Sequence, residues 1–530
     1  MSYPRRISAI AAAAAIALSA LSLAACTADP SPGEETDPTD AAGRSPMLTV
    51  GSQYPVMSLN PVLTPVSNVV TFAYDPVIFK ANDGSYLPDL ATEWGYVGDG
   101  NTVFEFTLRD GVTFQQGGEL DADAAVASLE YFLATPNSNG RSVGAIDSVE
   151  AVDERTVRIT YAAPFPNAVE SLTQFYGMGL LIGPDGLADP DGLEAESDGA
   201  GQYALNPDET VSGSTVAFTA NEDYFAPDAI RFDEVTISIL TDANARLSAL
   251  KSGQIDIAQQ IPVAQVGQSA LEGLQTLTGY TNWKSIQFLD TSSGPLASAD
   301  VRRAINLAID RETLVSAFYS GQAKVQEQTT PEGQVGFDES LVGSTPFDLD
   351  EAKSLLASAG YADGFELDLL TSTISDQGGL LGQVLVDQLA AAGITVNLTV
   401  ANGTFEELMG ALSGGEHDAV VYGLFANDLY TMVTQSIVTP GTLLNPNGAA
   451  DTTAEGLIAD AAQAADADVF AQTLRDLNAH LNDVSFGVPL VTESSTDIVS
   501  DAIVLPSTSY TIPQPNVVAP DPALAISKTS

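Results

Sequence analysis

The chain has 530 residues and a formal net charge of −50, from 19 basic and 69 acidic side chains. This length allows two or three domains with sizeable cores, and a hydrophobic content of 45% is typical of a globular protein. So large a negative charge disfavours nucleic-acid binding, which needs Lys and Arg to neutralise phosphates, and electrostatic docking on anionic lipid. The charge is compatible with cationic solutes, but a solvated acidic surface explains it most simply.

Residues 1–25 have the pattern of a lipoprotein signal peptide. Arg5 and Arg6 precede an apolar run over residues 7–23, and Cys26, the single cysteine, follows Ala-Ala. This end resembles a bacterial lipobox, in which the Cys thiol receives a diacylglycerol and the chain is cut before it. The alternatives are an ordinary secretory signal or a retained membrane helix, for which the run is short. Residues 26–46 have no apolar period and predict a disordered tether.

The globular chain begins with a predicted strand at residues 47–50. The stretch from Leu87 to Leu133 follows and is the most informative part of the sequence. Its alternating residues 102–108 predict a half-buried strand, and Asp121 is placed to cap a helix. The residues that form its pattern are Pro88, Leu90, Ala91, Trp94, Phe104, Phe106, Leu108, Arg109, Gly111, Val112, Phe114, Gly117, Leu120, Ala122 and Ser128.

This stretch resembles the signature of family 5 extracellular solute-binding proteins, the peptide- and nickel-binding components of ABC importers. It departs from that signature at Gln115-Gln116, where relatives carry His-Asp or Ser-Asp, and at Ala124, where an acid is usual. A generic hairpin followed by a helix is the alternative interpretation. Further segments resemble the family in the same order along the chain. They are residues 58–61, a loop near the ligand cleft; 72–78, a helix; 198–204; 221–225; 231–235; 251–257; 300–311; and 347–361.

The later part of the chain predicts alternating strands and helices. Asp348 and Glu351 have the spacing of a capping box, and Gly360 is placed to end that helix. Residues 365–370, 380–392 and 394–400 predict a βαβ unit with parallel strands. Arg302, Arg303 and Arg311 are expected to be structural ion-pair partners, Asp256 a structural turn residue, and the last dozen residues loosely ordered. The other predicted elements are strands at 145–152, 156–161, 215–220, 230–240, 419–424, 488–491 and 498–505, and helices at 244–250 and within 454–481.

The resemblance implies an α/β fold with two lobes and a hinge, of the type II periplasmic-binding-protein kind in its large three-region class. One lobe would combine residues 47–80, 200–295 and 486–520, with residues 81–199 as its accessory region. The other lobe would comprise residues 296–485. Solute would bind between the lobes, which close by hinge motion.

The resemblance also suggests ligand contacts. Residues 422–428 correspond to a G-W-x-x-D loop whose Asp pairs with a peptide's α-amino group, and Asn427 stands at that position here. Residues 371–377 lack the Arg that holds a dipeptide's carboxylate, so Asp376 could meet a cationic or hydroxylated ligand, or be a solvated loop acid. Trp283 could be an aromatic wall or a core residue. The candidate ligand-binding residues are Tyr54, Ser58, Asn60, Trp283, Asp376, Tyr422, Phe425, Asn427 and Asp428.

The first functional hypothesis is a monomeric lipoprotein, held on the outer side of the cell membrane by lipid at Cys26, that passes a solute to ABC permease subunits. An oligopeptide is the favoured solute, ahead of oligosaccharides and chelated nickel. A regulatory or scaffold lipoprotein with the same fold is the alternative. An exported hydrolase would need a nucleophile or acid pair that the sequence does not display. With His417 and His480 as its only histidines, the chain has no Cys/His cluster with metal-ligand spacing, so no catalytic residue, cofactor or metal is expected.

Overall fold

The structure is a computed structural model that describes residues 44–56, 58–64, 69–137, 140, 142–262, 272–373, 376, 379–402, 405–425, 429–506 and 516–529. An eleven-stranded sheet runs through this part of the chain in the order β15-β14-β16-β12-β17-β11-β1-β10-β9-β8, with β13 also paired to β17. Its strands are β1 (Ser45–Ser52), β8 (Tyr203–Leu205), β9 (Thr215–Ala220), β10 (Phe232–Ile239), β11 (Ile257–Ala258), β12 (Gln275–Phe288), β13 (Ala323–Val325), β14 (Phe365–Ser372), β15 (Ile394–Ala401), β16 (Ala419–Phe425) and β17 (Gly487–Val499).

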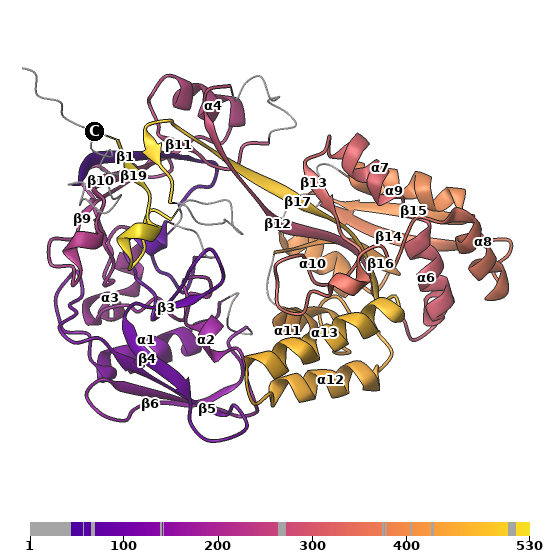
Figure 1. The fold of residues 1–530 in the computed structure, drawn as a ribbon, viewed down its shortest axis with the longest axis horizontal. Helices are drawn as coiled ribbons and strands as arrows, with labels where there is room; N and C mark the ends of the chain where they lie inside the picture. Colours follow the sequence, from indigo (N-terminus) through magenta and orange to yellow (C-terminus); the bar gives the residue numbers. More distant parts are fainter. Residues whose placement is uncertain are drawn as a thin grey trace, which may run out of the picture. The chain divides into compact units, whose positions relative to one another are not determined.

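Separate hydrophobic cores define two lobes. Lobe I is built on a core from Leu48 to Leu277 and from Val499 to Ile526. Lobe II is built on two cores that draw on residues between Trp283 and Val491. The long strands β12 and β17 pair antiparallel from Gln275↔Val499 to Gln287↔Gly487 and pass from one lobe to the other (Figure 1).

Lobe I contains the most informative stretch of the sequence. Phe104, Phe106 and Leu108 on β5 (Val103–Leu108) are buried, as their alternation predicts. The four-stranded sheet has the order β4-β5-β7-β6, with β4 (Ala91–Tyr96), β6 (Ile146–Ala151) and β7 (Thr156–Tyr161). Helix α1 (Ala122–Ala134) begins at Asp121, whose carboxylate accepts a 2.8 Å hydrogen bond from the Ala124 N–H, which confirms the predicted cap.

Lobe II has three layers. Helices α6 (Ala299–Leu307), α8 (Leu349–Ser358) and α9 (Leu380–Ala391) share a core with one face of the sheet. Helices α10 (Phe405–Ser413), α11 (Leu429–Met432), α12 (Thr452–Ala462) and α13 (Ala467–Asp483) share a core with the other face. Strands β14 and β15 are parallel, as the βαβ prediction requires. Gly360 and Gly393 both have φ of +94°, a conformation that glycine adopts without strain at a helix C-terminus.

Two sequence predictions differ from the structure near lobe I. Residues 72–78 form no α-helix: a 3₁₀ turn spans Val70–Phe72, and β2 (Ile78–Lys80) follows to pair with β3 (Tyr86–Pro88). Pro76 explains this, because a residue that precedes proline is disfavoured in the α region. The sequence also predicts strands at residues 488–491 and 498–505 with a break between them, whereas β17 continues unbroken from Gly487 to Val499.

The described end of the chain is packed, which corrects the prediction that it is loosely ordered. Strand β19 (Ser527–Lys528) pairs with β18 (Ile503–Val504), and the Ile526 side chain is fully buried in the core of lobe I. The Ile526 N–H donates to the Asn516 carbonyl, so the segment also folds on itself. Among the helices of the described ranges, none combines the length and the apolar character that a membrane crossing requires.

Candidate solute-binding site

The strand pair that joins the lobes is irregular at its centre. The β12–β17 register shifts between Tyr280 and Asn282 and again between Lys284 and Ser285. Such bulges bend a strand and re-aim its side chains, and they are frequent next to functional sites. The residues between the two shifts therefore lie in the irregular part of the strand pair, at the point where the chain passes between the lobes.

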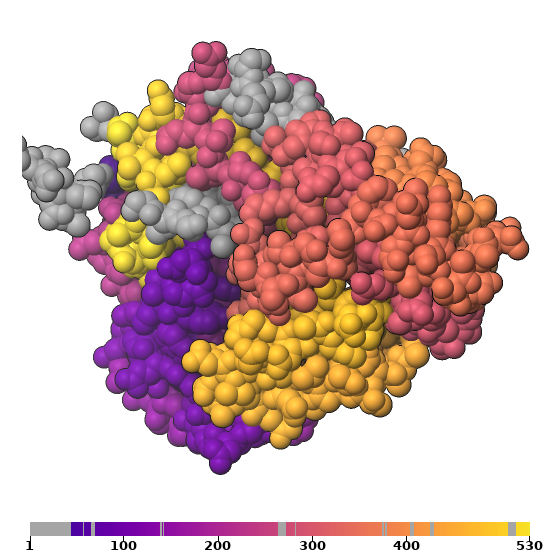
Figure 2. All heavy atoms as spheres, turned by 45° about the vertical axis from the view of Figure 1, so that its right-hand side comes forward, coloured from indigo at the N-terminus to yellow at the C-terminus, as the bar shows by residue number. Residues whose placement is uncertain are grey.

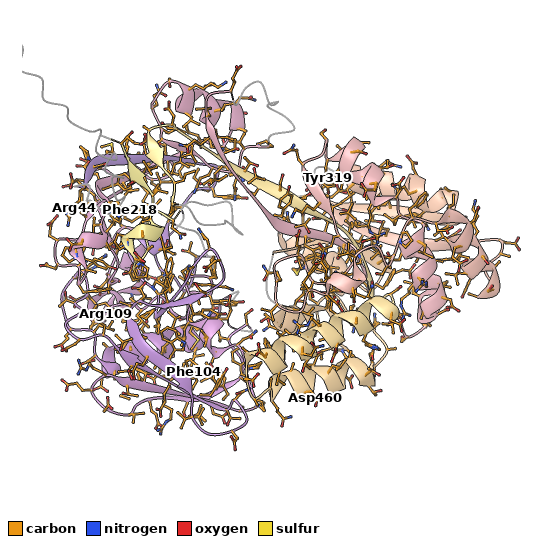
Figure 3. All side chains as sticks on the ribbon, in the orientation of Figure 1. Arg44, Phe104, Arg109, Phe218, Tyr319 and Asp460 are labelled. Atoms are coloured by element: carbon orange, nitrogen blue, oxygen red, sulfur yellow. The ribbon has the colours of Figure 1, made fainter. Side chains whose placement is uncertain are left out.

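A polar cluster lies on one face of this irregular segment. The Asn282 amide donates to Glu493 across the strand pair at 2.9 Å, and the Lys284 ammonium is 3.4 Å from the same carboxylate oxygen. Tyr319 is the residue after the π-helical turn Leu314–Phe318 (Figure 3). Its hydroxyl group also hydrogen-bonds to Glu493. The Asp376 carboxylate is close enough to raise the pKa of both Tyr319 and Glu493.

The electrostatics of the cluster are dominated by burial. Lys284 is 3% exposed and Tyr319 is 8% exposed. Burial raises the pKa of the Glu493 carboxyl, although Lys284 opposes that shift, and burial raises the pKa of Tyr319. Burying a charge pair is costly unless hydrogen bonds satisfy its members, and Asn282 and Tyr319 both hydrogen-bond to Glu493.

Asp376 has a structural role that the sequence did not reveal. It is 2% exposed, whereas a solvated loop acid was the expected alternative to a ligand contact. Its carboxylate accepts hydrogen bonds from the N–H groups of Leu381 and Gly382, both at 2.8 Å, and from the Thr371 hydroxyl at 3.0 Å. It thereby caps the first turn of α9 and ties it to the end of β14.

The predicted aromatic residues lie at different positions of the same sheet. Trp283 is 2% exposed and belongs to a core of lobe II, against which the half-buried Tyr422 packs. Both residues share the opposite face of the sheet from Lys284, because successive strand residues alternate in direction. Phe425, at the end of β16, is the register partner of Asn282. Asn427 and Asp428 lie outside the described residues.

The loop after β1 carries the three remaining candidates. Tyr54 is 60% exposed, so its side chain is available to a ligand. Asn60 is buried and engaged: its amide donates to the Tyr131 hydroxyl at 2.9 Å, and its side-chain oxygen accepts from the Val62 N–H at 3.0 Å. The Ser58 hydroxyl accepts a 3.0 Å hydrogen bond from the Asn60 N–H. Asn60 and Ser58 therefore shape this loop.

Sequence reasoning missed Asn282, Lys284, Tyr319 and Glu493. A usable signal was Lys284 itself, a cation in a strand-like run directly after Trp283, within a chain that has only 19 basic residues. Their mutual proximity had no local signal, because β12 and β17 are about 200 residues apart in sequence and pair only in the folded chain.

Two arginines of lobe II, the buried Arg311 and the half-buried Arg302, hydrogen-bond to the backbone. The Arg311 guanidinium donates to the carbonyl groups of Gln326 and Pro489 at 3.1 and 2.8 Å, and burial lowers its pKa to about 10. Arg302 donates to the carbonyls of Leu296 and Val484, both at 2.8 Å. Both are structural, as expected, but their hydrogen-bond partners are carbonyl groups rather than carboxylates. Asp256 is structural too, since it accepts from the Thr49 N–H and hydroxyl, each at 2.9 Å.

Polar contacts also join the lobes away from the crossing strands. The Asn101 amide donates to the carbonyls of Ala462 and Ala464 at 3.1 and 3.0 Å, and the Asn167 amide donates to the Thr431 hydroxyl at 3.1 Å. At the surface, helices α12 and α13 adjoin residues from the N-terminal part of the chain (Figure 2). Residues of the two lobes are thus in direct contact in this structure.

Within the part of the chain that the structure describes, no group of three or more His, Cys, Asp or Glu side chains is arranged to hold a metal ion. Cys26 lies outside that part.

Two α/β lobes joined by a pair of crossing strands, with a polar cluster beside the crossing, define a hinged binding protein. The family model of the bacterial extracellular solute-binding proteins, family 5, matches residues 85–437. The chain belongs to this family, which consists of solute-binding proteins and not of enzymes.

Individual proteins are similar to this chain in sequence or in fold. The chain is 26% identical to di/tripeptide-binding protein 1 of Pseudomonas aeruginosa over 65% of this chain and 68% of that protein. It is 25% identical to the glutathione-binding protein GsiB of Salmonella paratyphi A over 68% of this chain and 70% of that protein. The solved structure of HbpA2 from Haemophilus parasuis has a TM-score of 0.78 at 22% identity and covers 91% of this chain and 100% of its own.

Proposed function

We propose that this protein captures a solute between lobe I and lobe II and delivers it to the permease subunits of an ABC importer. The family assignment supports solute binding in general. The observation that carries the proposal is the polar cluster of Asn282, Lys284, Tyr319 and Glu493 beside the strands that join the lobes. A small solute, and an oligopeptide in particular, is the favoured ligand, because two relatives are named for binding di- or tripeptides and glutathione.

The proposed organisation follows the sequence. Residues 1–25 are a signal peptide, Cys26 carries the lipid, and residues 26–46 are a tether. Lobe I is proposed to combine residues 47–80, 200–295 and 486–520, with residues 81–199 as an accessory region, and lobe II to comprise residues 296–485. The monomer is anchored outside the cytoplasm. The candidate contacts are Tyr54, Ser58, Asn60, Trp283, Asp376, Tyr422, Phe425, Asn427 and Asp428, together with the polar cluster.

The ligand class is tested on residues 44–530, the unit that is compact in the structure. Its melting temperature is measured against di- to pentapeptides, oligosaccharides and nickel chelates. A ligand that binds only the native state raises stability by mass action, by about 2.7 kcal/mol at one hundred times its Kd. Lys284→Met is expected to weaken the response, whereas Lys353→Met, on the exposed surface of α8, is not. If no class of solute shifts the melting temperature, the scaffold alternative replaces transport.

Lipid anchoring is tested separately, with the full chain in a bacterial host fed labelled palmitate. The wild-type chain is expected to take up label and to sediment with membranes. Cys26→Ser removes the thiol that the lipid needs, so this variant should contain no label and remain in the soluble extracytoplasmic fraction. Label in the variant would show that the lipid is attached elsewhere.

A further inference from the structure

Lobe I contains a cavity that the proposed solute site does not use. One face of the sheet, through β1, β10 and β11, lines it on one side, and the segments 69–82 and 516–519 line it on another. Its walls are largely apolar and include Val50, Phe72, Phe79, Phe175, Ile237 and Ile257. Asp75 and Asp89 also line it, together with five uncharged polar residues: Thr71, Asn82, Gln174, Gln259 and Asn516. A cavity that combines an apolar wall with a few polar groups has the general character of a small-molecule site.

The backbone brings the two carboxyl groups together. The Leu90 N–H donates to the Pro76 carbonyl at 3.3 Å, and the Ala91 N–H donates to the Val77 carbonyl at 2.8 Å. These bonds place the residue before each segment, Asp75 and Asp89, side by side. Asp75 is 3% exposed and Asp89 is 1% exposed. Two buried acids in contact are costly, because like charges repel and water is excluded.

The hydrogen bonds of the pair come from Tyr224 and from the two carboxyl groups themselves. The Tyr224 hydroxyl donates to Asp75 at 2.5 Å, and the two carboxyl groups hydrogen-bond to each other. A carboxyl pair can share such a bond only if one member carries a proton. Apart from the Asp75 carboxyl group, no group of the described residues donates to the Oδ1 atom of Asp89. A buried acceptor in a cavity wall whose one hydrogen-bonding neighbour is another acid is a position that a donor on a ligand would satisfy.

The charges around the pair define what would fit. Burial is the main cause that raises the pKa of Asp75, to about 7, and the pKa of Asp89. Arg109, whose Nε donates to the Asp89 carbonyl, lowers the pKa of the Asp89 carboxyl. Tyr224 stays neutral, because burial raises its pKa. When the shared proton leaves, two carboxylates face one guanidinium, and the cavity has an unbalanced negative charge.

We propose that this cavity binds a small organic ammonium ion. Its amino group would donate to the carboxylates of Asp75 and Asp89 in place of the shared proton, and its hydrocarbon part would lie against the apolar wall. A bare metal ion fits less well, since the described residues hold no group of three His, Cys, Asp or Glu side chains placed to bind one. The site is distinct from the solute site at the crossing strands.

The test uses the full chain in detergent and isothermal titration with 3-methylbutylamine at pH 8. The neutral 3-methylbutan-1-ol has the same hydrocarbon part, and calcium chloride tests a metal. We expect the amine to bind with a millimolar or lower Kd and the alcohol and calcium not to bind. Protons compete for the same carboxylates, so a pKa of about 7 for Asp75 predicts roughly tenfold weaker amine binding at pH 6 than at pH 8. Equal binding of amine and alcohol, binding of calcium in place of the amine, or no amine binding would overturn the proposal.

Two variants test whether the amine binds at the Asp75–Asp89 pair. Asp89→Asn keeps the size of the side chain and removes its charge, so it should weaken amine binding at least tenfold. Asp83→Asn, in the exposed turn between β2 and β3, removes the same charge and should leave amine binding unchanged. Amine binding that survives Asp89→Asn would refute the proposal. The wild-type comparison of amine and alcohol at two pH values remains decisive if this variant fails to fold. A peptide response that persists without an amine response would refute this site and leave the proposed transport function intact.

Discussion

At the scale of single residues, buried acids are the informative exceptions in this acidic chain. Most of its 69 carboxylates can remain solvated, but Asp376 and Asp497 are almost completely buried. Asp376 accepts three hydrogen bonds and is held by them. Asp497 accepts one, from the Gln260 N–H at 2.8 Å, and burial raises its pKa to about 7. The two buried carboxyl groups thus differ in how many hydrogen-bond donors satisfy them.

Replacing Asp376 by Ala should destabilise lobe II. The change leaves two buried N–H groups at the start of α9 and the Thr371 hydroxyl without their acceptor. Lost caps and unsatisfied buried donors suggest a loss of about 2 kcal/mol in the free energy of unfolding. Urea unfolding measures it, with the exposed Asp363→Ala as the matched control. Equal midpoints for the two variants would contradict the capping role.

Asp497 should make stability depend on pH. Its pKa in the folded state is about 7, above its ordinary value of 3.8. Between pH 3.8 and pH 7, the folded state therefore holds a proton on Asp497 that the unfolded state has lost. Its contribution is therefore complete below about pH 4 and is lost as the pH rises through 7, and it amounts to a few kcal/mol at most. Asp497→Asn should flatten the fall in unfolding free energy between pH 4.5 and 8, whereas the exposed Asp501→Asn should not. Parallel pH profiles for wild type and Asp497→Asn would rule this out.

At the scale of elements, the end of the chain shows how far local signals reach. Its composition predicts loose order, yet β19 pairs with β18 and Ile526 is buried in the core of lobe I. Two residues of strand have little stability alone. Distant contacts hold them, such as the 2.8 Å hydrogen bond from the Gln202 amide to the Ala519 carbonyl. The segment therefore closes lobe I, although it lies more than 300 residues after Gln202.

Ile526→Ala should reduce stability by about 3 kcal/mol, because the removal of buried methyl groups loses transfer free energy and leaves a cavity. Val504→Ala, at a position that is 48% exposed in the paired strand β18, should cost well under 1 kcal/mol. Chemical denaturation of both variants provides the comparison. A negligible effect of Ile526→Ala would mean that this segment does not pack in solution.

At the scale of the whole molecule, the crossing strands and a few polar contacts join the two lobes. Asn101 is suited to such a contact, because it has φ of +52° and directs its amide to the carbonyls of Ala462 and Ala464. Only Gly, Asn and Asp adopt this conformation at low cost. The residue thus combines a turn in lobe I with a contact to lobe II.

Asn101→Gly should shift the protein toward the open form without straining the turn, since glycine tolerates positive φ. A solute that binds the closed form would then bind several-fold more weakly, because fewer molecules are competent to bind. Small-angle scattering of residues 44–530 should show a larger radius of gyration for the variant without ligand. Glu130→Gln, an exposed change on α1, is the control. Identical scattering of wild type and Asn101→Gly would argue against a closing contact.

The sequence by itself determined the family resemblance and the local elements with strong signals. Asp121 and Asp348 cap the helices that their spacing predicts, and β14, α9 and β15 form the predicted parallel unit. These features depend on neighbours within a few residues, so the sequence contains all the information they need. Only the tertiary structure decided that Trp283 is buried in a core of lobe II and that Lys284 meets Glu493. Those outcomes depend on pairing between strands that are far apart in the chain, and no local pattern encodes which distant partner a residue will meet.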